Sequence, residues 1–228
     1  MTKRPSIIAH RGFSGRYMEN TLDSVRGALK LGVDFVEVDV QETRGGELIV
    51  FHDYRLNRLC GVRGCVCDKT LAEIRRWNPQ VPTLREVLRA CRGRARVLIE
   101  IKRADPRKVA ALITDLHMER DVVVFSLSIS RLKSFAAAAP RVSRFGLIAR
   151  RLRLSLFAFR SPLTIEGLGL SRRLVTSPRV VRRIHRRGWK VFVWTVNREA
   201  EMKKLASWGV DGIITNHPDL AKSCLARP

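Results

Sequence analysis

The chain has 228 residues, of which 45% are hydrophobic, and it carries a formal net charge of +23. This apolar content excludes a chain that is disordered throughout, and no apolar run reaches the ~18 residues of a transmembrane helix. The apolar run before His10 is too short for the core of a secretory signal, so we expect a cytoplasmic protein.

The positive charge is concentrated in one half of the chain. Residues 141–190 contain 13 arginines and one lysine against a single acid, Glu166. Such a field attracts phosphorylated substrates, anionic membranes or nucleic acids, although genome composition or a hot habitat gives the same pattern. Residues 150–160 mix four arginines with leucine and phenylalanine, which suggests either contact with an anionic membrane surface or an ordinary barrel helix. Because no nucleic-acid-binding motif is present, we expect no specific nucleic-acid partner.

The cysteines do not form a secreted disulfide framework, because their number is odd and no signal precedes them. They are Cys60, Cys65, Cys67, Cys91 and Cys224. The spacing of the first three is not that of a zinc finger. We expect free thiols, with a disulfide from Cys60 to Cys65 or Cys67 as the alternative.

Short β-rich runs alternate with helical patterns along the chain. The predicted strands are residues 6–9, 35–40, 48–51, 97–101, 122–125, 145–149, 163–168, 191–196 and 212–215. The predicted helices are residues 21–31, 83–91, 107–116, 179–187 and 199–208. The alternation predicts an α/β protein with a parallel sheet covered by helices, and its repetition favours a closed (β/α)8 TIM barrel in a single domain, residues 1–228.

Two regions depart from this alternation. There are nine predicted strands for eight places in a barrel, and the turn at residues 43–46 leaves no room for a helix between the second and third. One run in this region therefore leaves the barrel, and the sequence does not say which. Residues 53–82 contain three cysteines and several glycines and prolines, and they are predicted to be a small insertion after the third run.

Two acids occupy one face of the second predicted strand. Glu37 and Asp39 are two residues apart and point to the same side, whereas the valines between and beside them point to the other. Two carboxylates that face a barrel interior need a cation or hydrogen bonds, because burying unpaired charge costs several kcal/mol. The alternative is that this face is exposed to solvent.

A third acid repeats the pattern on the fourth predicted strand, where Glu100 and Lys102 share one face. Three carboxylates without cysteine or paired histidine spacing form an all-oxygen set, which suits one divalent cation, Mg²⁺ or Ca²⁺, better than zinc. A surface ion pair between Glu100 and Lys102 is the alternative.

Two histidines, His10 and His52, each follow an apolar run. Beside a divalent ion, two histidines can perform general acid and base catalysis near neutral pH. Arg11 and Lys102 add positive charge that suits a phosphoryl group.

Several short motifs follow one another in a specific order. They are His10-Arg11-Gly12, Glu19-Asn20-Thr21, Glu37-Val38-Asp39-Val40, Phe51-His52-Asp53, Glu100-Ile101-Lys102, Val193-Trp194-Thr195-Val196-Asn197 and Gly212-Ile213-Ile214-Thr215-Asn216. The ordered set resembles the signature of the glycerophosphodiester phosphodiesterase family, over nearly the whole chain. The family fold is a (β/α)8 barrel with a small insertion, which residues 53–82 fit.

The resemblance implies a role for each matching residue. His10 and His52 would be the acid and base, Glu37, Asp39 and Glu100 would hold the cation, Arg11 and Lys102 would contact the phosphate, Trp194 would line the pocket, and Glu19 and Asn20 would lie beside the site. Met18 stands where the family usually has proline, and Asn216 stands where the family commonly has aspartate. We expect neither to touch the acid–base or metal residues.

The resemblance therefore implies metal-dependent hydrolysis of glycerophosphodiesters to glycerol 3-phosphate and an alcohol by two-histidine catalysis. The alternatives are a phospholipase D-like hydrolase of lysophospholipids, a basic protein that binds nucleic acid, and an inactive barrel at a membrane surface. The sequence leaves several points open. They are the headgroup preference, the choice of cation, which histidine is the acid and which the base, whether attack is direct or through a cyclic intermediate, and the oligomeric state.

Overall fold

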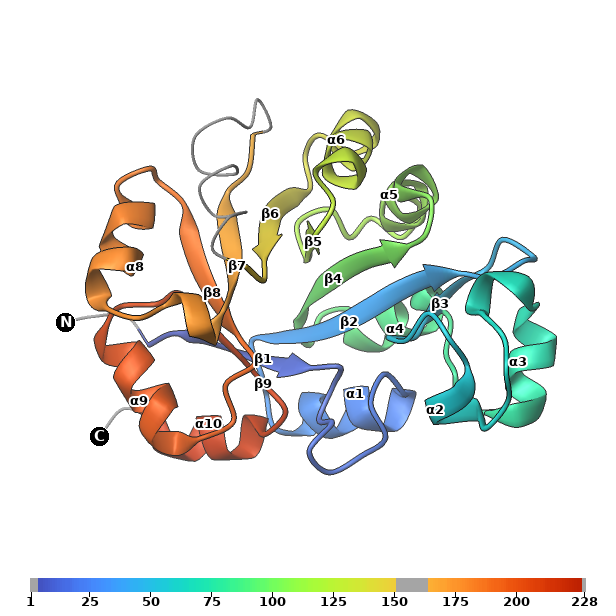
Figure 1. The fold of residues 1–228 in the computed structure, drawn as a ribbon, viewed down its shortest axis with the longest axis horizontal. Helices are drawn as coiled ribbons and strands as arrows, with labels where there is room; N and C mark the ends of the chain where they lie inside the picture. Colours follow the sequence, from blue (N-terminus) through green and yellow to red (C-terminus); the bar gives the residue numbers. More distant parts are fainter. Residues whose placement is uncertain (1–3, 151–163, 227–228) are drawn as a thin grey trace.

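The computed structural model describes residues 4–150 and 164–226. Within these residues the chain forms a closed barrel of parallel strands surrounded by helices (Figure 1). The barrel strands are β1 (Ser6–His10), β2 (Phe35–Glu42), β4 (Arg96–Arg103), β5 (Val122–Ser126), β6 (Ser143–Ile148), β7 (Gly167–Ser171), β8 (Lys190–Trp194) and β9 (Gly212–Thr215). Because β1 pairs with both β9 and β2, the barrel closes, and the predicted (β/α)8 fold is confirmed.

Helices cover the outside of the barrel (Figure 1). They are α1 (Leu22–Lys30), α4 (Leu84–Cys91), α5 (Pro106–Asp115), α6 (Ile129–Ala138), α8 (Pro178–His185), α9 (Glu199–Ser207) and α10 (Pro218–Cys224), with a short 3-10 turn, η2 (Arg172–Leu174), after β7. Capping boxes fix the first turns of α1 and α4, where Thr21 and Thr83 accept from the backbone three residues on. The five predicted helices are present, whereas α6 and α10 were not singled out from the sequence.

The strand that leaves the barrel is β3 (Leu48–Val50), which pairs antiparallel with β2. A turn of a few residues reverses the chain, and only antiparallel strands can be joined in this way, because a parallel pair needs a crossover of a dozen residues or more. The far edge of β3 is covered by the segment before α4, where the Val50 amide donates to the carbonyl of Pro82 at 2.9 Å.

The prediction for the seventh strand was wrong in its position. The sequence predicted a strand at residues 163–168, but β7 spans Gly167–Ser171. Gly167 and Gly169 face the barrel interior against Phe145 and Leu147, and their lack of side chains leaves room for these larger ones. Strands with interior glycines have a weak sequence signal. Residue 163 and residues 151–160 of the segment suggested to contact membranes lie outside the described residues.

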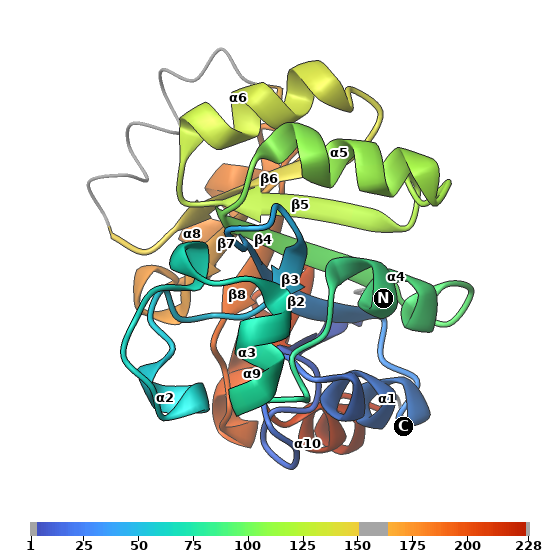
Figure 2. The same cartoon turned by 90° about the vertical axis from the view of Figure 1, so that its right-hand side faces the viewer.

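Residues 53–82 form an insertion, as predicted, with α2 (Asn57–Cys60), η1 (Val66–Asp68) and α3 (Leu71–Trp77). The insertion lies on the side toward which the arrowheads of β2 and β4 point (Figure 1), and it is nearest the viewer in Figure 2. A separate apolar cluster holds it, made of Ile49, Phe51, Leu56, Val66, Ile74 and Val81. All five cysteines, each among the described residues, are free thiols.

Two further apolar clusters pack the barrel itself. A large cluster packs the helices against the outer face of the sheet. A smaller cluster fills the barrel interior with Ile8, Phe35, Leu98, Val123, Phe125, Phe145, Leu147, Phe192 and Ile214. No helix among the described residues is long and apolar enough to cross a membrane.

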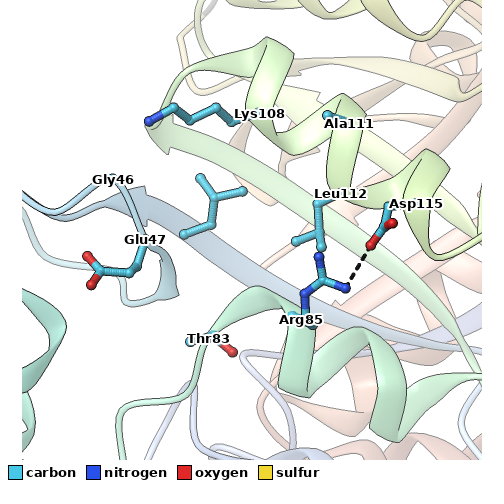
Figure 3. Close-up of a pocket in the computed structure, with 9 residues that line it drawn as sticks. Gly46, Glu47, Thr83, Arg85, Lys108, Ala111, Leu112 and Asp115 are labelled. Atoms are coloured by element: carbon cyan, nitrogen blue, oxygen red, sulfur yellow. Dashed lines mark hydrogen bonds and ion pairs between the residues drawn. The ribbon is translucent and has the colours of Figure 1, made fainter.

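A hollow of about 470 Å³ lies outside the barrel, between β3 and the helices α4 and α5 (Figure 3). Leu48 and Leu112 contribute apolar surface, and an ion pair of 2.7 Å joins Arg85 to Asp115. None of the residues that the sequence singled out for chemistry lines this hollow.

The interior glycines of β7 give a test of barrel packing. A methyl group at Gly167 would lie 2.5 Å from the Phe145 ring and 2.7 Å from the Lys190 carbonyl. One at Gly169 would be crowded by the end of Leu147 at 3.0 Å, with Phe125 and Trp194 in ordinary contact at 3.8 Å. Gly167→Ala should lower the free energy of unfolding by about 1–3 kcal/mol, as overpacking does. Gly169→Ala, the matched control, should cost less, because Leu147 can move. Equal losses in urea denaturation would contradict this packing.

Candidate active site

The predicted site residues meet at the carboxyl ends of β1, β2 and β4. Pairing places His10 opposite Glu37, and Asp39 opposite Glu100, on adjacent strands. Val36, Val38 and Val40 belong to the cluster between sheet and helices, so the acids point inward as the alternation predicted. In a (β/α)8 barrel this end is where active sites are built.

The three acids form one compact group. Glu37, Asp39 and Glu100 each offer an oxygen within 4.8 Å of the others. Glu37 and Asp39 are each 1% exposed, so the alternative of a solvent-exposed face is wrong. Lys102 Nζ lies 3.7 Å from Glu100 and 3.6 Å from Asp39 in the barrel mouth, so the alternative of a surface ion pair is also wrong.

The charges in this group are unequally balanced. Burial would raise the pKa of Asp39, but Arg11, whose Nε lies 3.1 Å away, and Lys102 outweigh it and hold that pKa below its usual value. Burial and the charge of Asp39 raise the pKa of Glu37, and they raise the pKa of Glu100 to about 7. Without further positive charge, the ionised forms of Glu37 and Glu100 are therefore disfavoured relative to that of Asp39. A hard divalent cation fits this all-oxygen set because it would let all three acids ionise.

The backbone around the acids is held in unusual conformations. Arg11 has φ 55° and Asn20 has φ 59°, both in the left-handed region that costs free energy for residues other than glycine. The Arg11 amide donates to Glu37 Oε2 at 2.9 Å, and Asn20 Nδ2 donates to Asp39 Oδ2 at 3.0 Å. These bonds fix the acids and explain why both turns sit beside them.

Both histidines are oriented through Nδ1. His10 Nδ1 lies 2.6 Å from Asn216 Oδ1, and His52 Nδ1 lies 2.6 Å from Asp53 Oδ1. Since both partners are acceptors, each Nδ1 carries a hydrogen and each Nε2 is left for chemistry. Burial and the neighbouring Arg11 charge lower the pKa of His10 to about 4.

The expectation that Asn216 stands apart from the acid–base residues was wrong. It follows β9, next to β1 in the barrel, and its side-chain oxygen accepts from both His10 and Ser14. An amide oxygen accepts this hydrogen bond as a carboxylate would, so the departure from the family pattern preserves the contact but removes a negative charge from it.

Sequence reasoning missed Gln41. This residue is 1% exposed, and its Nε2 donates to the carbonyls of Phe51 at 2.9 Å and Asp53 at 2.6 Å, on either side of His52. It continues the two-residue alternation of Glu37 and Asp39, and this signal could have found it. Gln41 thereby ties the turn that carries His52 to β2.

The remaining predicted residues lie around the mouth. Glu19 Oε1 accepts from Arg11 Nη1 at 3.0 Å. Trp194 ends β8, and its buried Nε1 has no hydrogen-bond partner among the described residues. An unpaired buried donor is costly, so it suits an oxygen of a bound ligand.

Comparisons with known proteins point to one enzyme family. Residues 10–220 match the glycerophosphoryl diester phosphodiesterase family. A glycerophosphodiester phosphodiesterase of Bacillus subtilis is 33% identical over 246 residues, covering 93% of this chain and 84% of the relative. A glycerophosphodiester phosphodiesterase of Caldanaerobacter subterraneus subsp. tengcongensis is 31% identical, and the alignment covers 93% of this chain and 94% of the relative.

The fold matches as well. The crystal structure of a glycerophosphodiester phosphodiesterase from Agrobacterium tumefaciens aligns with a TM-score of 0.82 and 30% identity, covering 96% of this chain and 99% of the other. Barrel, site and relatives together define a phosphoric diester hydrolase. The chain belongs to the glycerophosphoryl diester phosphodiesterase family, which confirms the resemblance found in its sequence.

The raised pKa of Glu100 predicts how the cation-free protein responds to pH. Between the ordinary value of 4.5 and about 7, the folded chain holds a proton that the unfolded chain has lost, so stability should fall as pH rises through this window. Glu100→Gln stays neutral and should raise Tm above the window by a few degrees, since about 1 kcal/mol corresponds to about 2–4 °C at this length.

Thermal melts with and without chelator check this expectation. Added Mg²⁺ should stabilise the wild type more than Glu100→Gln. Glu119→Gln, in the turn before β5, is the matched control and should change neither response. A Glu100→Gln protein that melts below the wild type in chelator would contradict the charge imbalance.

Proposed function

We propose that this chain hydrolyses glycerophosphodiesters to glycerol 3-phosphate and an alcohol with the help of a bound divalent cation. The observation that carries the proposal is the group of three inward carboxylates beside two histidines whose Nε2 atoms are both left for chemistry. The names of the Bacillus and Caldanaerobacter relatives support the choice of glycerophosphodiesters as substrates.

Glu37, Asp39 and Glu100 would hold the cation. When bound there, a divalent ion supplies positive charge that neutralises a phosphodiester and the charge developing on it. Arg11 and Lys102 border the same carboxylates and would add hydrogen bonds to the phosphate oxygens. Cationic side chains held in place beside buried carboxylates stabilise such charge more than mobile ions in bulk water would.

The histidines would move the protons. One, as the neutral imidazole, accepts the proton of the attacking hydroxyl at its Nε2, and the other, as the doubly protonated imidazolium, donates its Nε2 proton to the leaving alkoxide. Asn216 and Asp53 keep the Nδ1 hydrogen of each ring in place, so that neither ring turns away. Trp194 would line the pocket and donate from Nε1 to a substrate oxygen.

The first prediction concerns the cation. Chelator should lower hydrolysis of glycerophosphocholine by about 10²-fold or more, because a metal contributes several kcal/mol to transition-state stabilisation. Mg²⁺ or Ca²⁺ should restore the wild type but not Asp39→Asn. A lysophospholipid assayed in parallel distinguishes the phospholipase D-like alternative. Full activity in chelator, with no metal found by elemental analysis, would contradict the proposal.

The second prediction concerns the histidines. His10→Asn and His52→Asn should each lower kcat by about 10²-fold or more, the usual size for lost acid–base catalysis. Both proteins should keep a wild-type circular dichroism spectrum, since both residues lie at the barrel mouth. The matched control is His117→Asn, at an exposed turn after α5. If a folded His10 or His52 variant keeps wild-type kcat, that residue is not part of the pair.

A further inference from the structure

An arginine of the insertion joins the two histidine motifs. Arg58 lies on α2, and its Nε donates to Asp53 Oδ2 at 2.7 Å. Its Nη2 donates to Glu19 Oε1 at 2.6 Å. Asp53 follows β3 and Glu19 precedes α1, so one guanidinium bridges two segments that are far apart in the chain.

Each carboxylate bound by Arg58 is in turn bound to a proposed active-site residue. Asp53 uses its other oxygen to accept from His52 Nδ1 at 2.6 Å. Glu19 Oε1 also accepts from Arg11 Nη1 at 3.0 Å, and Arg11 Nε lies 3.1 Å from Asp39. The contacts therefore run without a break from His52 through Arg58 to the proposed cation ligand Asp39.

The carboxylates of Asp53 and Glu19, which Arg58 joins, both favour the ionised form. The hydrogen bond from Arg58 lowers the pKa of Asp53 to about 2 despite partial burial. Burial would raise the pKa of Glu19, but hydrogen bonds and charge from Arg58 and Arg11 leave it lowered. Toward the ring of His52, an ionised Asp53 can accept a hydrogen bond but cannot donate one, which keeps the ring in one tautomer and one orientation.

Arginine is the side chain that suits this place. Its planar guanidinium offers several donors in a fixed fork, so two carboxylates can be held at a set angle, whereas a lysine ammonium is a flexible point charge. The helix α2 has four residues and no fully buried one. The hydrogen bonds from Arg58 to Asp53 and Glu19 therefore attach α2 to the barrel mouth.

We propose that Arg58 is a positioning residue, which fixes Asp53 and Glu19 together so that His52 and Arg11 face the phosphodiester in one geometry. This inference rests on the proposed function and assigns the insertion a part in it. The alternative is that Arg58 forms only a half-exposed surface ion pair that does not affect turnover, since many surface ion pairs contribute little.

The test compares Arg58→Gln with Arg63→Gln, a matched control in the same insertion whose side chain is exposed. Both remove one positive charge, so effects of net charge cancel. With saturating Mg²⁺ and glycerophosphocholine, Arg58→Gln should lower kcat by about 10-fold or more and change KM less, because small misplacements of catalytic groups are costly. Arg63→Gln should stay within about 2-fold of the wild type.

Arg58→Lys guards against misfolding of the glutamine variant and separates charge from geometry. Lysine keeps the charge but cannot span both carboxylates at a fixed angle. The kcat of Arg58→Lys should therefore lie clearly below that of the wild type, although the Tm values of the two proteins should be close. Full recovery by lysine would overturn the proposal, because charge alone would then suffice.

A double-mutant cycle shows whether Arg58 acts through Asp53. In an Asp53→Asn background, Arg58→Gln should cost much less than in the wild type, since coupled residues are not additive. Additive losses overturn the proposal. If hydrolysis by the wild type depends on His52 but Arg58→Gln keeps the wild-type kcat, the proposed role of Arg58 is wrong and the proposed function stands. A wild type that hydrolyses no glycerophosphodiester overturns the proposed function and this inference together.

Discussion

Three carboxylates share the mouth of the barrel with two cationic side chains, and the arrangement around them follows from this imbalance. Arg11 and Lys102 hold the pKa of Asp39 low, whereas burial and the charge of Asp39 raise the pKa values of Glu37 and Glu100. A protein tolerates such a group when a ligand completes it, because perturbed acids in a cleft cost stability and gather at functional sites. The left-handed turns at Arg11 and Asn20 are part of the same arrangement, since each donates a hydrogen bond to one of these acids.

The two-residue period of the strands explains how one barrel holds both an apolar interior and this charged mouth. On β2 the inward side changes from Phe35 to Glu37 and Asp39, and on β4 it changes from Leu98 to Glu100. The apolar layer closes the barrel below the acids, so water reaches them from one end only. Charge interactions are strongest in such a setting, where solvent screens them least.

Much of this could be read from the sequence, because its signals are local. The alternation at Glu37 and Asp39 predicted the inward acids, and the alternation of strands with helices predicted the barrel. Which of the two runs beside the turn at residues 43–46 leaves the barrel could not be read, since the run of β3 differs in no way from a barrel strand until its pairing is known. The start of β7 was missed because Gly167 and Gly169 are selected by Phe145 and Leu147, which lie on another strand. Gln41 lay within reach of the same alternation, but the roles of Asn216 and Arg58 depend on contacts between distant segments.

We propose that Glu37, Asp39 and Glu100 together bind one divalent cation at the barrel mouth, and the proposed chemistry depends on this site. The most direct measurement is anomalous X-ray diffraction from crystals of the protein grown with Mn²⁺, which binds oxygen ligands and scatters anomalously. We expect a single strong anomalous peak within bonding distance of all three carboxylates, and we expect this peak to be absent from crystals of Asp39→Asn. A fully occupied Mn²⁺ elsewhere, with no peak among these three acids, would contradict it.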